Sequence, residues 1–123
     1  MNSDECKTYG NQAEMLVNDL LVERGFQAVR QPDGDPFDIL VYKDFDPNIG
    51  LEVKYLGASN GGTRIDKPAL RRKEHFAETV GLSKTLTVIV THDWRVGFRE
   101  GIENKPKSTF NYDIKEFVQE MRT

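Results

Sequence analysis

The stretch Gly50-Leu51-Glu52-Val53-Lys54-Tyr55 decides the fold, and it is predicted to form a short β-strand. Alternate side chains of a strand point to opposite faces, so Leu51 and Val53 share one face while Glu52 and Lys54 share the other. Charged groups on a buried face are costly unless they are paired. We therefore predict that this strand carries part of a catalytic site, in which a metal ion and a water lie between Glu52 and Lys54.

Outward from this strand, the sequence predicts one α/β domain spanning residues 1–123, with residues 1–7 as a flexible arm. Apolar residues at helical spacing predict helices over 7–24, 66–80 and 111–121. Runs rich in β-branched residues and alternating patterns predict strands over 26–30, 37–42, 49–56, 85–91 and 95–99. The order is therefore αβββαββα, with loops expected at 57–63 and 103–109.

Prolines, glycines and caps set the expected boundaries. Residues 44–48 are predicted to turn the chain back, with Pro47 as the breaker. Asp66 is expected to cap the second helix and Gly81 to end it. Its sheet-facing side chains are predicted to be Leu70, Phe76, Ala77 and Val80.

Charge is segregated along the chain, whose formal net charge is -3. Residues 31–46 hold five aspartates against one lysine. Residues 64–73 hold one aspartate against five basic residues, namely Arg64, Lys67, Arg71, Arg72 and Lys73. This pattern fits a metal site beside a phosphate-binding surface, and an ordinary solvated helix face is the alternative.

Two features of the sequence bear on where the protein is expected to act. The single cysteine, Cys6, cannot form an internal disulfide, which favours a reducing, cytoplasmic setting. We expect no membrane contact, because no apolar run approaches the length of a membrane span.

Two carboxylates are expected to meet across neighbouring strands. Asp38 begins one strand and Glu52 lies on the next, and two carboxylates so placed repel unless a proton or cation lies between them. Oxygen ligands of this kind suit Mg²⁺ or Mn²⁺. Lys54 would hold or help deprotonate the attacking water, and Glu14 would lean in as a further ligand from the first helix. The alternative is a surface Asp38 with an exposed Glu52–Lys54 ion pair.

The order of these residues resembles a known family. Helical Glu14, then Pro36-Phe37-Asp38, then Glu52-Val53-Lys54 resembles the PD-(D/E)xK nuclease superfamily. More narrowly, residues 10–14, 24–30, 38–41 and 51–54 resemble the archaeal-type Holliday-junction resolvases, small dimeric enzymes that cut four-way DNA junctions. The resemblance implies a restriction-endonuclease-like core, in which a central mixed five-stranded β-sheet is flanked by helices.

The resemblance also implies roles for individual residues. Asp38 and Glu52 would bind the metal, Lys54 would be catalytic, Glu14 would be a further active-site acid, and Arg30 would contact DNA near the scissile phosphate. We therefore expect a homodimeric, Mg²⁺-dependent DNA endonuclease that resolves four-way junctions, with Mn²⁺ able to substitute. Exposed basic residues would help bind the DNA, and we expect these to be Arg64, Lys67, Arg71 and Arg72.

Two other hypotheses stay open. The same chemistry could act on flaps, ends or duplex DNA in viral or plasmid replication or in repair. Alternatively, the chain is a non-catalytic nucleic-acid-binding protein that kept the fold.

Overall fold

The structure is a computed structural model that describes residues 3–57, 65–102 and 109–122. Its elements follow one another as α1 (Ser3–Glu23), β1 (Gln27–Arg30), β2 (Ile39–Lys43), β3 (Asp46–Leu56), α2 (Lys67–Val80), β4 (Lys84–Thr91), β5 (Val96–Glu100) and α3 (Ile114–Arg122). The expected order αβββαββα is confirmed. Most of the loop expected at 57–63, and of that at 103–109, lies outside the described residues.

The strands form one mixed five-stranded sheet, as predicted, and their order in it is β1-β2-β3-β4-β5. β3 and β4 are parallel, and every other neighbouring pair is antiparallel. The parallel pair is joined through α2, because parallel strands need a crossover connection. The sheet is therefore built around β3, which carries the Glu52 and Lys54 pair.

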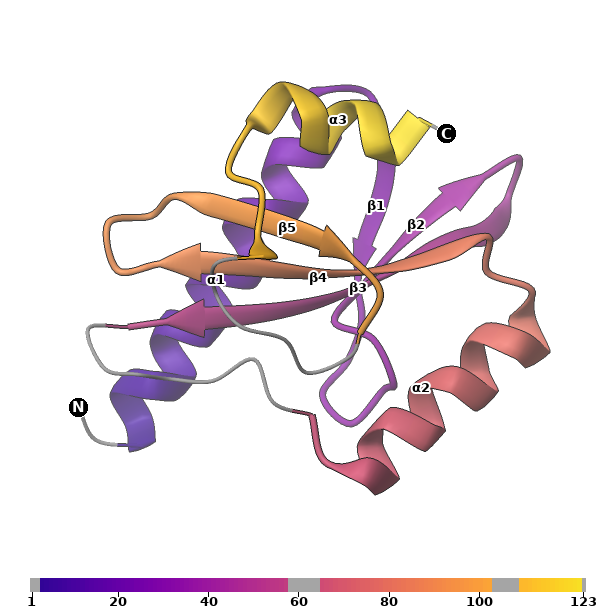
Figure 1. The fold of residues 1–123 in the computed structure, drawn as a ribbon, viewed down its shortest axis with the longest axis horizontal. Helices are drawn as coiled ribbons and strands as arrows, with labels where there is room; N and C mark the ends of the chain where they lie inside the picture. Colours follow the sequence, from indigo (N-terminus) through magenta and orange to yellow (C-terminus); the bar gives the residue numbers. More distant parts are fainter. Residues whose placement is uncertain (1–2, 58–64, 103–108, 123) are drawn as a thin grey trace.

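Helices cover the sheet on both faces (Figure 1). On one face, α1 and α3 bury apolar side chains such as Val17 and Phe117 against the odd-numbered residues of β3, Leu51 among them. On the other face, α2 packs Leu70 and Phe76 into a second cluster with Phe37 and Leu40. Glu52 and Lys54 alternate with the residues that face α1, so they lie on the α2 face of the sheet.

Strand β3 begins earlier than the sequence indicates. The expected turn over 44–48 is only the two-residue tip formed by Asp44 and Phe45, whose φ angles are 52° and 72°. This is the left-handed geometry of a tight hairpin turn. Pro47 lies within the strand, opposite Tyr42, where the register of the β2–β3 ladder shifts. A proline is tolerated at such an irregularity because the regular hydrogen-bond ladder is already broken there.

Helix ends show which boundary signals were reliable. Asp66 caps α2 by accepting a hydrogen bond from the Ala69 N–H at 2.8 Å, and Gly81 ends it with φ of 82°, as predicted. Val80 was expected to face inward, but it is 36% exposed, and it is the last residue of α2.

The two outer helices differ from expectation at their starts. The first helix was expected to begin near residue 7, after a flexible arm over residues 1–7, but α1 begins at Ser3. α3 begins at Ile114 rather than at 111, because the Asp113 carboxylate accepts hydrogen bonds from the N–H groups of Lys115 and Glu116. Within the described parts of the chain, no helix is long and apolar enough to cross a bilayer.

Gly50 leaves no room for a side chain on the α2 side of β3. A Cβ atom added there would lie 2.9 Å from Phe37 Cδ1 and 3.0 Å from Leu82 Cδ1. We predict that Gly50→Ala lowers the free energy of unfolding by about 1–3 kcal/mol through overpacking. The matched control is Gly10→Ala on α1, where nothing lies within 4 Å and a gain of about 0.5–1 kcal/mol is expected. Urea unfolding of both variants tests this, and a Gly50→Ala protein as stable as the parent would contradict it.

Candidate active site

The β2–β3 register brings the two predicted carboxylates together. Ile39 pairs with Leu51, so Asp38, one residue before β2, comes opposite Glu52 on the next step of the ladder. The Asp38 N–H donates to the Leu51 carbonyl at 3.0 Å, and the Val53 N–H donates to Asp38 Oδ2 at 2.8 Å. These bonds fix both the backbone and the side chain of Asp38 beside β3.

Glu52 is buried between two lysines. Its side chain is 8% exposed, with Oε1 3.1 Å from Lys54 Nζ and Oε2 2.8 Å from Lys73 Nζ. The two lysines differ in access to solvent, because the Lys54 side chain is 34% exposed and that of Lys73 only 10%. A buried carboxylate is stable only when paired in this way.

Lys73 is the site residue that sequence reasoning missed. It was placed with the basic residues of the predicted DNA-binding surface, but it points inward from α2 and is 8% exposed. Its ammonium donates to the Pro36 carbonyl oxygen and lies 5.4 Å from the centroid of the Phe37 ring. The signal was present, because Lys73 follows Leu70 by three residues and precedes Ala77 by four, on the inward stripe of the helix.

Glu14 and Arg30 form an ion pair with each other. Arg30 Nη2 lies 3.2 Å from Glu14 Oε1. Glu14, the predicted metal ligand, is therefore paired with Arg30, the predicted DNA contact. Burial raises the pKa of Glu14, while the Arg30 hydrogen bond opposes that rise. The charges of Asp33 and Glu52 add to the rise, which shows that Glu14 lies within electrostatic reach of Glu52.

The electrostatics of Asp38 show how closely the acids are held. Burial, and then the neighbouring charge of Glu52, raise the pKa of Asp38 to about 7, although the Val53 N–H opposes this. A cation between the two carboxylates would remove that repulsion, and carboxylate oxygens are ligands that Mg²⁺ and Mn²⁺ accept. Asp38 and Glu52 therefore fit a divalent metal ion.

The wider ligand set is not assembled in the described residues. Across these parts of the chain, no group of three His, Cys, Asp or Glu side chains is placed to hold a metal. Metal binding by Asp38 and Glu52, and the contribution of Glu14, stay predictions.

The predicted DNA-binding residues lie mainly on α2. Lys67, Arg71 and Arg72 are exposed there, as a phosphate-binding surface requires. Arg64 lies outside the described residues. Since Lys73 on the same helix reaches Glu52, α2 links the exposed basic side chains to the acidic site.

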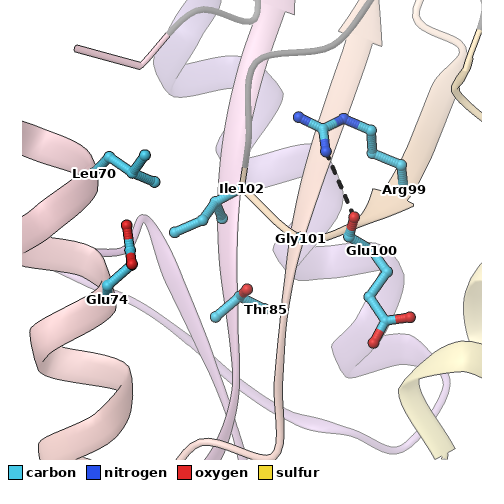
Figure 2. Close-up of a pocket in the computed structure, with 7 residues that line it drawn as sticks. All are labelled: Leu70, Glu74, Thr85, Arg99, Glu100, Gly101 and Ile102. Carbon is cyan, nitrogen blue, oxygen red and sulfur yellow. Dashed lines mark hydrogen bonds between the residues drawn. The ribbon is translucent and has the colours of Figure 1, made fainter. Parts of the chain in front are cut away.

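A cavity of about 450 Å³ lies elsewhere, between α2 and the ends of β4 and β5. Figure 2 shows Leu70 and Glu74 of α2 facing Ile102, with Arg99 Nη1 donating to the Glu100 carbonyl oxygen at 3.5 Å. None of the predicted catalytic side chains lines this cavity. The candidate site at β2 and β3 is therefore separate from this cavity.

Comparison with known proteins defines the fold more closely. The sequence matches no protein-family model and no curated protein. The fold, however, is that of an archaeal Holliday junction resolvase. One similar solved structure is Hjc of Archaeoglobus fulgidus, described as a Holliday junction resolvase from an archaeal hyperthermophile.

The similarity covers 90% of this chain and 96% of the Hjc chain, with a TM-score of 0.62 and 16% sequence identity. At this level of identity the comparison shows a shared fold. It confirms, for the fold, the resemblance drawn from residues 10–54.

The raised pKa of Asp38 predicts how stability depends on pH. Between about pH 4 and pH 7 the unfolded chain has lost the Asp38 proton while the folded chain keeps it, so the metal-free protein loses stability as pH rises. We predict that Asp38→Asn is more stable than the parent at pH 8 without metal, by on the order of 2–4 kcal/mol. The difference should vanish near pH 3.5.

Thermal unfolding in EDTA at several pH values measures this effect. Asp35→Asn, in the neighbouring exposed turn, is the matched control and should follow the parent protein. An Asp38→Asn protein whose melting temperature falls as steeply as that of the parent between pH 5 and pH 8 would show that Asp38 is not destabilised by burial and Glu52.

Proposed function

We propose that the protein is a metal-dependent, structure-selective DNA endonuclease that resolves four-way (Holliday) junctions. The observation that carries this proposal is the pairing of Asp38 with Glu52 across β2 and β3, with Lys54 beside them on β3. The resolvase fold supports it, because this chain shares that fold over 90% of its length.

The proposed chemistry is phosphodiester hydrolysis. Asp38 and Glu52 would hold Mg²⁺, with Mn²⁺ able to substitute, and Glu14 would contribute once Arg30 releases it. The bound ion supplies a Lewis acid that polarises the scissile phosphate and lowers the pKa of a water. Lys54, one-third exposed, has the access to orient that water and to stabilise charge on the phosphate oxygens.

The exposed basic residues would position the DNA. Arg30 lies next to the acidic site, and Lys67, Arg71 and Arg72 lie on the helix that covers it. Such contacts bind phosphates without reading base sequence, which suits an enzyme that selects a DNA shape. We further propose that the protein acts as a homodimer, because resolving a junction needs two symmetric cuts and a two-fold dimer supplies two equivalent sites.

A second candidate keeps the chemistry and changes the substrate to flaps, ends or duplex DNA. The net charge of -3 favours it, because binding all four arms of a junction draws on a large basic surface.

Cleavage assays separate these proposals. We predict Mg²⁺-dependent cutting of labelled four-way junctions that EDTA abolishes and Asp38→Ala removes. Lys54→Met should lower kcat by about 10²–10⁴-fold, the usual contribution of a positioned proton-transfer group. Lys43→Met, an exposed lysine at the far end of β2, is the control and should cut normally.

The substrate panel decides between the candidates. Cutting of flaps or linear duplexes in preference to junctions would favour the second candidate. Absence of metal-dependent cutting on every substrate would leave a non-catalytic nucleic-acid-binding protein.

The α2 surface generates a separate prediction about binding. Arg71→Ala and Arg72→Ala should each weaken binding to every DNA shape by a similar factor. Each should also flatten the dependence of log K on log salt by about one unit. Fluorescence anisotropy at several salt concentrations, without divalent ions, measures this, with Lys43→Ala as the exposed control. Unchanged slopes would mean that this face of α2 is only solvated.

A further inference from the structure

The candidate site contains three carboxylates and three cationic groups. The carboxylates are those of Glu14, Asp38 and Glu52, and the cationic partners are Arg30, Lys54 and Lys73. These six side chains carry no net charge when all are ionised. The site is thus neutralised by the protein's own cations before any metal ion or DNA arrives.

The two lysines on Glu52 are held differently. Lys54 comes from the same strand as Glu52, and its side chain is 34% exposed, so it can move into solvent or toward a phosphate. Lys73 is enclosed: its side chain is 10% exposed, and its ammonium also donates to the Pro36 carbonyl oxygen beside the Phe37 ring. Of the two lysines, Lys54 on Oε1 is therefore the one that a divalent ion at Glu52 would displace more readily, because Lys73 on Oε2 is enclosed.

We propose that Lys73 is a resident cation of the active site: a positioning residue that holds Glu52 Oε2 permanently and weakens divalent-metal binding in the DNA-free protein. The inference rests on the proposed function, because it concerns the same metal site. Lys73 and a metal ion on Glu52 would lie within a few ångströms of each other, where like charges repel strongly in a partly buried site.

This arrangement couples metal binding to the substrate. A phosphate brings negative charge to the site and draws Lys54 and Arg30 toward itself, so the carboxylates become available when DNA is present. A DNA-free protein with Lys73 in place would bind metal weakly, and the metal would bind tightly only together with a phosphate.

Two substitutions at one position separate charge from structure. Lys73→Gln removes the charge but keeps an N–H donor for Glu52 and Pro36, whereas Lys73→Arg keeps the charge. Lys115→Gln, an exposed lysine on α3, is the control. Calorimetric titration of each DNA-free protein with Mn²⁺ gives the dissociation constant, and thermal unfolding with and without Mn²⁺ gives the stabilisation by the metal.

For Lys73→Gln we expect lower stability without metal but a higher affinity for Mn²⁺. Lys73→Gln should melt at a lower temperature than the parent without metal, yet bind Mn²⁺ about tenfold more tightly and gain more in melting temperature on adding it. Lys73→Arg and Lys115→Gln should bind Mn²⁺ like the parent. An Mn²⁺ affinity of Lys73→Gln that is equal to or weaker than that of the parent would overturn the inference, because a merely structural lysine predicts that outcome.

A measurement on the unmodified protein covers the case in which Lys73→Gln does not fold. Amine acetylation mapped by mass spectrometry should show Lys73 protected with and without Mn²⁺, and Lys54 more reactive once Mn²⁺ is added. Acetylation of Lys73 on adding Mn²⁺, or an unchanged rate at Lys54, would refute the proposed roles. Failure of the proposed function is distinct: the parent protein would then neither bind Mn²⁺ nor cut any DNA.

Discussion

The buried carboxylate of Glu52 is the constraint on which the rest of the structure depends. It lies on a central strand, 6% exposed, where an unpaired charge would be severely destabilising. One cationic partner, Lys54, comes from its own strand, but the other must come from another element. Lys73 supplies it, which holds α2 against the sheet and brings the Pro36 carbonyl close to the site. The turn before β2, and Asp38 within it, are thereby tied to β3.

Such a network is better suited to specifying a geometry than to adding stability. Buried ion pairs often contribute little net free energy, because desolvation offsets their attraction, whereas breaking one partner is costly. Burial, and then the neighbouring charge of Glu52, raise the pKa of Asp38, so ionising Asp38 in the folded protein is costly. Lys54 and Lys73 offset the charge of Glu52, and Asp38 and Glu52 supply the carboxylate oxygens that the proposed metal site would need.

Hydrophobic periodicity predicted the element order, and the adjacency of two strands predicted the meeting of Asp38 with Glu52. The mixed sheet followed from the family resemblance. Prediction from the sequence failed where tertiary context overrides local preference. Pro47 is accepted inside β3 because the ladder is already irregular there, and residues 3–7 extend α1 without any distinctive pattern. Lys73 was misplaced because a lysine among arginines suggests a solvated surface, whereas its spacing along α2 places it inward. No local sequence pattern shows that Lys73 pairs with Glu52, because the two residues lie on different elements.

The crossover from β3 through α2 to β4 has a consequence for where this site can exist. Connections between parallel strands of one sheet are almost always right-handed, a result of the chirality of L-amino acids. With β4 beside β3, that handedness dictates which face of the sheet α2 covers, and Glu52 points to that face. A shift of β3 by one residue would instead turn Glu52 toward α1 and α3, where no lysine of α2 can reach it. Two features therefore determine which helix supplies the second cation to Glu52. One is the handedness of the crossover connection, and the other is the face of the sheet to which Glu52 points.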